Sequence, residues 1–196
     1  MNQKTSKKER GKVRIIAGTW RHRILSFPLE EGLRPSPDRV RETLFNWLMP
    51  YIQGAVCLDL FSGSGALGFE ALSRGAKEVV MIDQNTRTIK QLKENATLLG
   101  AQNAHILQTY VPVHFPSAIP QTFDLVFLDP PFQSDLLSSC CEWLQESCLL
   151  NPSALIYIET HQQKQLECIP PTWDVFRSKQ SGNLRYSLYR KQPLKK

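Results

Sequence analysis

Short apolar runs and amphipathic segments alternate along most of the chain. Apolar runs of strand length lie near residues 55–60, 78–82, 104–108, 123–129, 153–160, 173–179 and 184–190. Apolar residues at helical spacing lie near residues 65–74, 86–99 and 134–147. Because strands and helices alternate, this pattern predicts an α/β fold with a doubly wound, mostly parallel sheet. The last two strands have only Ser181-Gly182-Asn183 between them, so they should form a hairpin and make the sheet mixed.

The N-terminal part of the chain has a different pattern. Residues 13–18 and 21–27 mix apolar and basic residues around a Gly-Thr-Trp turn, which predicts a small β-hairpin. After a loop, Ser36 and Pro37 predict the start of a helix, with the serine as its cap and the proline at its first position.

The helix that follows has one apolar face, formed by Val40, Leu44, Trp47 and Leu48. The polar residues mainly off that face are Arg39, Arg41, Glu42 and Asn46. They are either solvated or placed to close a ligand cleft.

Composition limits the class of protein. The chain has 196 residues, 41% of them apolar, which suits one hydrophobic core. No apolar run approaches a membrane span and the N-terminus lacks a signal-peptide pattern, so we expect a cytoplasmic protein without a membrane partner. The five cysteines form no Cys-x-x-Cys pair and the four histidines are scattered, so we expect neither a disulfide framework nor a metal site.

Positive charge is concentrated at the N-terminus. The net charge is +6, but residues 1–41 alone carry +7 and the rest of the chain carries −1. A basic arm on a neutral body suits a polyanionic substrate such as a nucleic acid. Residues 1–12 could equally be a solubilising disordered tail. For Arg14, Arg21 and Arg23 the nucleic-acid interpretation is stronger, because they alternate with apolar residues on predicted strands.

The most informative motif is Asp129-Pro130-Pro131-Phe132, which ends the apolar run that begins at residue 123. The carboxylate can accept a hydrogen bond from an amine, and the two prolines make the turn stiff and leave its carbonyl groups free to accept. Phe132 can stack on a planar base. The motif favours a site that holds a planar amine for methyl transfer; the alternative is a Pro-Pro turn with Asp129 as a local cap.

A glycine-rich motif follows the strand at residues 55–60. Gly63-x-Gly65-x-x-Gly68 matches the dinucleotide fingerprint, with a strand before it and a helix after it. Asp59 departs from the dehydrogenase pattern, because it places an acid in the strand where it could bind the ammonium of S-adenosylmethionine. Asp83 ends the next apolar run, where an acid typically binds ribose hydroxyls. The alternative is that both acids are strand-end caps.

Together these residues resemble class I S-adenosylmethionine-dependent methyltransferases that modify exocyclic amino groups. The segments Arg14-Ile15-Ile16-Ala17-Gly18-x-x-Arg21 and Leu33-Arg34-Pro35-Ser36-x-Asp38-Arg39-Val40-Arg41-Glu42-Thr43-Leu44-Phe45-Asn46-Trp47-Leu48 narrow the resemblance. They look like the RsmD family of bacterial small-subunit ribosomal RNA guanine-N2 methyltransferases. The resemblance covers residues 13–189. The chain departs from related enzymes at Gln108-Thr109-Tyr110, where an acidic turn often lies near the adenine.

The resemblance implies a Rossmann-like, seven-stranded mixed sheet with its last strand antiparallel. It divides the chain into a disordered basic tail (1–12), a substrate-binding hairpin and loop (13–37) and a class I methyltransferase domain (38–196). The implied cofactor is S-adenosyl-L-methionine, the implied substrate is 16S ribosomal RNA within the small ribosomal subunit, and a monomer is expected.

Candidate residues follow from the motifs and the resemblance together. The catalytic candidates are Asp129, Pro130, Pro131 and Phe132. The cofactor candidates are Asp59, Phe61, Ser62, Gly63, Ser64, Gly65, Asp83, Gln84 and Thr109. The RNA candidates are Arg14, Arg21, Arg23, Arg34 and Arg39.

Guanine is favoured over adenine by chemistry as well as by resemblance. Its N1–H and N2 amine are adjacent donors that suit an acceptor-only carboxylate. Three other functions compete: an adenine-N6 methyltransferase, a nucleotide-binding oxidoreductase, and a non-catalytic RNA-binding or ribosome assembly factor. The oxidoreductase leaves Asp129–Phe132 and the basic arm unexplained, and intact Asp59 and Asp129 argue against the assembly factor.

Overall fold

A seven-stranded sheet organises the part of the chain that the computed structural model describes, which is residues 10–30, 35–111, 122–131, 136–162 and 168–192. Its strands are β3 (Val56–Asp59), β4 (Glu78–Asp83), β5 (Ala104–Gln108), β6 (Phe123–Leu128), β7 (Leu150–His161), β8 (Trp173–Ser181) and β9 (Leu184–Lys191). The helices are α1 (Asp38–Leu48), α2 (Ala66–Ser73), α3 (Thr86–Leu99) and α4 (Leu136–Glu146). The predicted elements of the α/β body are all confirmed, with boundaries shifted by a few residues.

The strand order is β5-β4-β3-β6-β7-β9-β8. Neighbouring strands from β5 to β7 pair in parallel, and β9 pairs antiparallel with both β7 and β8. The predicted mixed sheet is therefore confirmed, including the hairpin made by the last two strands.

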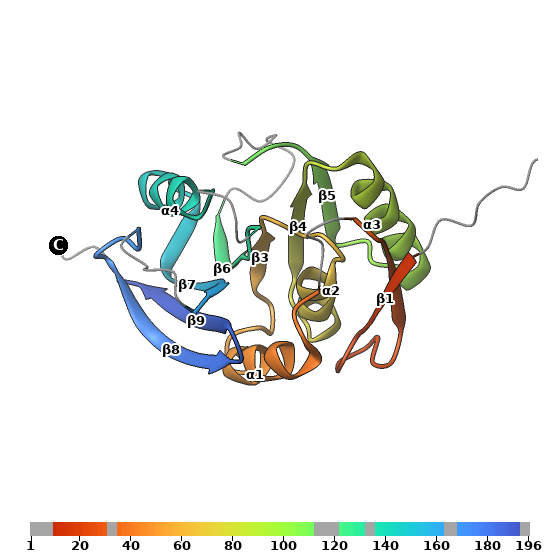
Figure 1. Ribbon diagram of the computed structural model, residues 1–196, viewed down its shortest axis with the longest axis horizontal. Coiled ribbons are helices and arrows are strands. Elements are labelled where there is room, and N and C mark those ends of the chain that lie inside the picture. The colour runs from red at the N-terminus through yellow and green to blue at the C-terminus, as the bar shows by residue number, and fades with distance from the viewer. Residues whose placement is uncertain (1–9, 31–34, 112–121, 132–135, 163–167, 193–196) are drawn as a thin grey trace, which may run out of the picture.

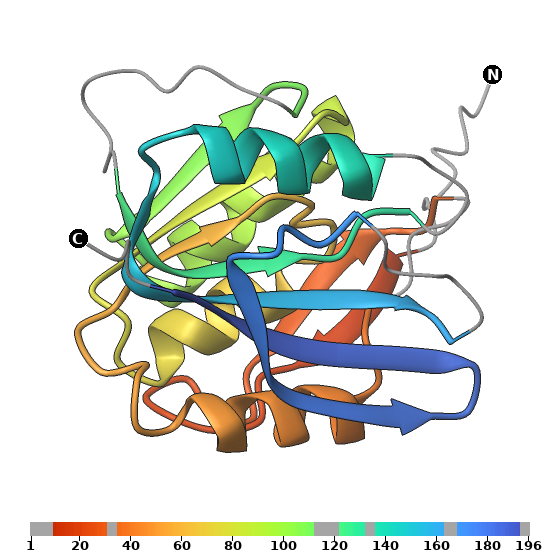
Figure 2. The ribbon, with the colours of Figure 1, turned by 90° about the vertical axis from the view of Figure 1, so that its left-hand side faces the viewer.

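Helices cover both faces of the sheet. Side chains of α1, α2 and α3 pack into one cluster of buried residues, and side chains of α4 pack into the other. Figure 2 shows α4 above the sheet and α1 below it. In the sheet, β3 has β4 and β5 on one side and the later strand β6 on the other. The direction in which the chain adds strands to the sheet therefore reverses at β3. Ligands of open α/β sheets bind at such a switch point, beyond the carboxyl ends of the strands.

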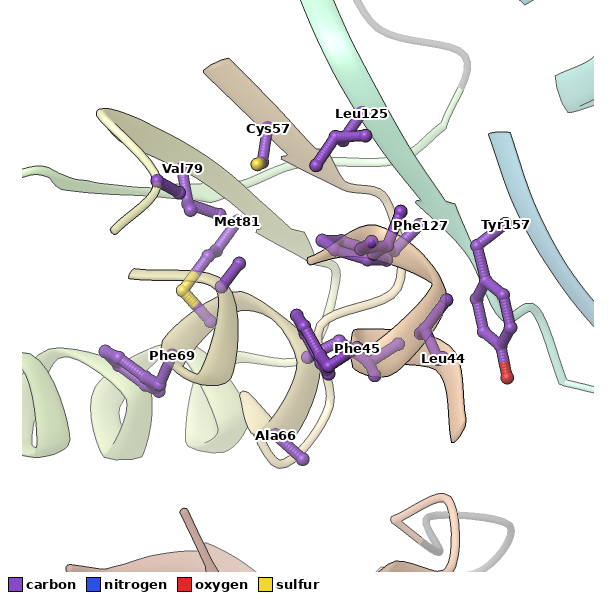
Figure 3. Close-up of a cluster of buried hydrophobic side chains, with 14 of the residues drawn as sticks. Leu44, Phe45, Cys57, Ala66, Phe69, Val79, Met81, Leu125, Phe127 and Tyr157 are labelled. Atoms are coloured by element: carbon purple, nitrogen blue, oxygen red, sulfur yellow. The ribbon is translucent and has the colours of Figure 1, made fainter. Parts of the chain in front are cut away.

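Three aromatic rings pack together in the core on the α1 and α2 face. Phe127 lies between Phe45 of α1 and Tyr157 of β7, with ring centroids 6.0 Å and 6.5 Å away. Figure 3 shows these rings beside Leu44, with the Tyr157 hydroxyl pointing away from the apolar cluster. Each buried aromatic ring contributes on the order of 1.5–3 kcal/mol to stability through burial. This packing fixes the carboxyl ends of β6 and β7.

The N-terminal hairpin consists of β1 (Arg10–Arg14) and β2 (Ile24–Pro28), which pair antiparallel as a separate sheet. It lies beside α3 (Figure 1). The Asn95 amide of α3 donates to the Ser26 carbonyl at 2.9 Å and accepts from the Ser26 N–H at 3.4 Å. The predicted hairpin is confirmed, but its bounds are wrong. Residues 10–12, predicted as tail, belong to β1, and Arg21 and Arg23, predicted on a strand, lie in the segment between β1 and β2.

The predicted cap of α1 is wrong. The helix begins at Asp38, Pro37 occupies the cap position, and no side chain caps the helix. The Ser36 hydroxyl instead donates to Glu159 Oε2 at 2.9 Å, and the two residues are 123 positions apart in the sequence. A hydroxyl that finds a buried carboxylate gains a stronger hydrogen bond than a helix N–H would provide.

Arg41 is also placed differently from both interpretations of its sequence position. Its side chain is 1% exposed, so it is neither solvated nor at an open cleft. The guanidinium donates to the Arg14 carbonyl at 3.0 Å, to the Ser36 carbonyl at 3.3 Å and to Asp38 Oδ1 at 2.6 Å. Arg39, Glu42 and Asn46 of the same helix are exposed.

Candidate active site

Three carboxyl groups share one edge and one face of the sheet. Asp59 ends β3 and lies opposite Phe127 of β6. Leu128 pairs with Ile158, so the next residues are neighbours: Asp129 lies just after β6, and Glu159 lies within β7 near its carboxyl end. Because residues paired across neighbouring strands point to the same face, the three carboxyl groups all face the α1 and α2 side.

The glycine loop connects the end of β3 at Asp59 to the start of α2 at Ala66. Gly65 has a φ of 77°, which favours glycine, and a Cβ atom there would lie 2.7 Å from Phe69 and Leu92. At Gly68 a Cβ atom would lie 2.9 Å from the Met81 side chain, so a glycine lets α2 pack closely on β4. Gly68 therefore serves the helix–strand packing that the fingerprint assigns to its third glycine, and Gly65 is required by its backbone conformation and by its crowded surroundings.

Asp59 is a buried carboxyl, 2% exposed, at the start of this loop. Its Oδ2 accepts the Gly68 N–H of α2 at 3.2 Å. The pKa of Asp59 is raised to about 7: burial and the charge of nearby Asp83 raise it, whereas the Gly68 N–H and the Ser62 hydroxyl oppose the rise. A ligand ammonium beside Asp59 would favour the ionised form and offset this cost. The cofactor ammonium as the partner of Asp59 stays a prediction.

Asp83, at the end of β4, also binds the glycine loop. Its Oδ2 accepts the Gly63 N–H at 3.1 Å and its Oδ1 accepts the Asn85 N–H at 2.8 Å. Partial burial raises the pKa of Asp83, the N–H groups oppose the rise, and Glu30 adds to it. Since Asp83 is half-buried, its carboxylate can reach a ligand at the loop.

The remaining cofactor candidates surround the same loop. Ser62 and Ser64 are buried, Phe61 is half-buried, and Gln84 is exposed just after β4. Thr109 follows β5 and donates its N–H to the Asp83 carbonyl at 3.2 Å. The structure therefore brings the predicted set together at the carboxyl ends of β3, β4 and β5, and whether each residue binds the cofactor stays a prediction.

Asp129 begins the Asp-Pro-Pro-Phe motif one residue after β6 ends. It is half-buried, Pro130 is buried and Pro131 is exposed; Phe132 lies outside the described residues. Burial raises the pKa of Asp129 well above its usual range, the charges of Glu159 and Asp59 add to the rise, and the Ser36 hydroxyl opposes it. Asp129 is thus a carboxyl with a high proton affinity at the open edge of the sheet.

Glu159 is the residue of this site that the sequence analysis missed. It is 4% exposed, and its Oε2 accepts hydroxyl hydrogen bonds from Ser36 at 2.9 Å and Tyr157 at 2.6 Å. Burial raises the pKa of Glu159, and the two hydroxyl groups oppose the rise. The signal was present, because Glu159 follows an apolar run in the same way that Asp129 does.

The predicted RNA-binding arginines lie on and around the hairpin. Arg14, Arg21, Arg23 and Arg39 are exposed, and Arg34 lies outside the described residues. Two of them also contact the protein: Arg14 pairs with Asp38 at 3.4 Å, and Arg23 donates to the Leu98 carbonyl at 3.3 Å.

A groove of about 390 Å³ lies between the hairpin and residues 35–38. Lys12 and Arg14 line it together with apolar Phe27, and its lining includes Ser36. The groove therefore joins exposed basic residues to the side chain that binds Glu159.

A buried ion-pair network attaches the hairpin to the glycine loop's helix. Glu70 of α2, which is fully buried, accepts the Ile16 and Ala17 N–H groups at 2.7 Å and 3.0 Å. Its carboxylate also pairs with Arg74 at 2.7 Å and lies 3.7 Å from Arg41. The segment after β1 is thus held by charge-assisted hydrogen bonds rather than by strand pairing with the main sheet.

In the described residues, no group of three or more His, Cys, Asp or Glu side chains could hold a metal ion. No helix among those residues is long and apolar enough to cross a membrane.

Comparison with known proteins relates the chain to a protein family. Residues 13–190 match the model of a family described as "Conserved hypothetical protein 95". The chain is 46% identical over 183 residues to ribosomal RNA small subunit methyltransferase D of Haemophilus influenzae, covering 92% of this chain and 94% of that protein. It is 42% identical to the protein of the same name from Escherichia coli K12, covering 93% and 91%. The solved structure of a putative methyltransferase, yhhF from Escherichia coli, superposes with a TM-score of 0.81 at 41% identity, covering 93% of this chain and 99% of that one.

Proposed function

The chain belongs to the family of ribosomal RNA small subunit methyltransferase D, and from this premise we propose that it transfers a methyl group from S-adenosylmethionine to the exocyclic N2 amine of a guanine in 16S ribosomal RNA. The observation that carries the proposal is the position of Asp129. It joins a stiff Pro-Pro turn to the same sheet edge as Asp59 and the glycine loop. One site can therefore hold a cofactor and an amine together.

Asp59, Asp83 and the glycine loop would hold the cofactor. Asp59 pairs with its ammonium and Asp83 accepts from its ribose hydroxyls. The bound cofactor supplies an electrophilic methyl group on a sulfonium.

Asp129 and the Pro130 carbonyl act on the amine. Hydrogen bonds from the amine protons favour a pyramidal nitrogen and make its lone pair available. Holding this nitrogen close to the methyl group and in line with it supplies much of the rate. Phe132, whose place is predicted from sequence alone, provides a stacking face for the base.

The base must leave its helix to reach this site, so the target guanine is unpaired or easily flipped. The exposed arginines of the hairpin and the groove beside residues 35–38 are suited to the flanking RNA backbone. Basic side chains that bind phosphates position the substrate, and Asp129 selects the base.

Nucleoside mass spectrometry tests this function. The enzyme is incubated with isotopically labelled S-adenosylmethionine and with either 16S ribosomal RNA or small subunits from a strain lacking its own enzyme of this family. Label in N2-methylguanine is expected with the wild type and not with Asp129→Ala. Label in N6-methyladenine would move the assignment to an adenine methyltransferase, and label in no nucleoside would contradict methyl transfer to RNA.

A further inference from the structure

We propose that Glu159 is a positioning residue of the methyl-acceptor site, which acts through Asp129, and that the hydroxyl groups of Ser36 and Tyr157 hold it as the carboxylate. This inference rests on the proposed function, because it concerns the group that receives the amine's proton. The Asp-Pro-Pro-Phe motif alone does not include Glu159, which comes from the next strand of the sheet.

Strand register places the two carboxyl groups side by side. Leu128 of β6 pairs with Ile158 of β7 in parallel register, and the next residues along the two segments are Asp129 and Glu159. Neighbouring strands are about 4.8 Å apart, so side chains at equivalent positions are in direct reach of each other. Two carboxylates so close repel, and one of them holds its proton more tightly.

The hydrogen-bond partners indicate which of the two ionises first. Both hydroxyl groups donate to Glu159, at 2.6 Å from Tyr157 and 2.9 Å from Ser36, and donors favour the charged form. Glu159 therefore carries the negative charge of the pair. Asp59 on β3 is the other acid whose charge acts on Asp129.

The charge on Glu159 matters for the methyl transfer itself. As the nitrogen–methyl bond forms, the methyl–sulfur bond breaks and its electron pair stays on sulfur. The nitrogen then carries a positive charge and must release a proton to give the neutral methylamine. Asp129, as the carboxylate, takes up that proton, and the neighbouring charge on Glu159 strengthens its affinity for it.

Ser36 connects this pair to the rest of the molecule. Its carbonyl accepts from the buried Arg41 guanidinium at 3.3 Å, and Ser36 is one of the residues that line the groove beside the hairpin. The N-terminal extension therefore contributes a side chain to the acceptor site as well as a basic surface.

Shifts of one pH profile in a common direction test the inference. Single-turnover methyl transfer to 16S ribosomal RNA is measured from pH 5 to pH 9.5 at saturating S-adenosylmethionine. Glu159→Gln removes the charge beside Asp129, so the acidic limb should move to lower pH by about one unit or more. Tyr157→Phe removes a hydroxyl that donates to Glu159 and favours its charged form, so the limb should move in the same direction by a smaller amount. A purely structural role would not move the limb in both variants.

Thr160→Val serves as the matched control. Thr160 is buried on the same strand, and its hydroxyl has no hydrogen-bond partner in the described structure. Its profile should coincide with that of the wild type, and the cofactor affinity of all three variants should be unchanged. If both Glu159→Gln and Tyr157→Phe leave the limb in place, the inference is wrong even though methyl transfer proceeds. If the wild type itself forms no N2-methylguanine, the proposed function fails instead.

An NMR titration of Asp129 tests the inference independently of enzyme activity. Carboxyl carbon signals of ¹³C-labelled aspartate are followed by NMR in the wild type and in Tyr157→Phe, and Asp129 is assigned from its loss in Asp129→Asn. The Asp129 signal should titrate at lower pH in Tyr157→Phe than in the wild type, because Glu159 is then charged less strongly. Identical titration curves would overturn the proposal.

Discussion

The two ends of the candidate site hold their carboxyl groups by different means. At β3 and β4, Asp59 and Asp83 accept backbone N–H groups of Gly68, Gly63 and Asn85, which lie 9, 20 and 2 positions from their acceptors along the chain. At β6 and β7, Glu159 accepts side-chain hydroxyls, and one of these comes from a residue 123 positions away.

The two kinds of donor suggest that cofactor binding depends on a local motif, whereas selection of the methyl acceptor depends on tertiary contacts. Backbone donors are supplied by the turn itself, so the β3–β4 end is defined by a local motif and suits a cofactor common to many enzymes. Side-chain donors depend on which segments meet, so the β6–β7 end depends on how the N-terminal extension docks. Variants that affect only one end should separate the two.

The largest effect is expected at the anchor of the extension. Glu70→Ala should lower the free energy of unfolding by about 3–5 kcal/mol, because Arg41 and Arg74 would lose their buried partner. Denaturant unfolding measures the change. Glu94→Ala is the control, since its pair with Arg10 is exposed and should cost less than about 1 kcal/mol. Equal costs for the two variants would mean that the network does not anchor the extension.

The next largest effect concerns the acceptor end alone. Asp129→Ala should reduce the rate of methyl transfer by roughly 10²–10³-fold, the usual contribution of one preorganised polar group. Cofactor affinity should hardly change, because Asp59 and the glycine loop are intact. Single-turnover kinetics and calorimetry on the same preparation measure both quantities. A variant that retains more than about a tenth of the rate would remove Asp129 from catalysis.

The cofactor end should respond in the opposite way. Asp59→Asn should weaken S-adenosylmethionine binding by about 1.5–3 kcal/mol, the value of a hydrogen bond to a charged group. Calorimetry at pH 8 measures it, with Asp174→Asn on the exposed face of β8 as the control. Unchanged affinity in the folded variant would exclude Asp59 from the cofactor site.

The same variant should be more stable than the wild type without cofactor. Since the folded pKa of Asp59 is raised to about 7 from 3.8, the folded state binds the proton more tightly than the unfolded state does. The stability of the wild type therefore falls as pH rises between these two values, by up to about 4 kcal/mol. The advantage of Asp59→Asn should grow from pH 4 to pH 7 and then level off, as measured by thermal unfolding. A constant difference across that range would contradict the raised pKa.

The smallest effect is expected on the RNA-binding surface. Lys12→Ala should lower the salt dependence of RNA affinity, with the slope of log K against log salt falling by about 0.7–0.9 if Lys12 contacts one phosphate. Lys93→Ala, on α3, provides a basic residue outside the groove as the control. Equal slopes for the two variants would mean that the groove does not bind RNA.

Local sequence patterns predicted the body of the molecule and one end of its site. Apolar runs, glycine spacing and the final turn each depend on neighbours a few residues away, so the strands, helices and the loop from Asp59 to Gly68 could be located without a structure. The same logic identified Asp129, because a polar motif that ends an apolar run can be found in the sequence.

Contacts between distant segments decided the rest. Ser36 looked like a helix cap, since a serine before a proline usually is one, yet its hydroxyl binds Glu159. Arg41 looked solvated or close to a cleft, yet it is buried against Glu70. The amino-acid sequence by itself determined the sheet, the glycine loop and the charged arm, because backbone geometry and apolar periodicity are local. Only the tertiary structure decided which buried charges meet, because the free energy of burying a charge depends on partners that arrive from elsewhere in the chain.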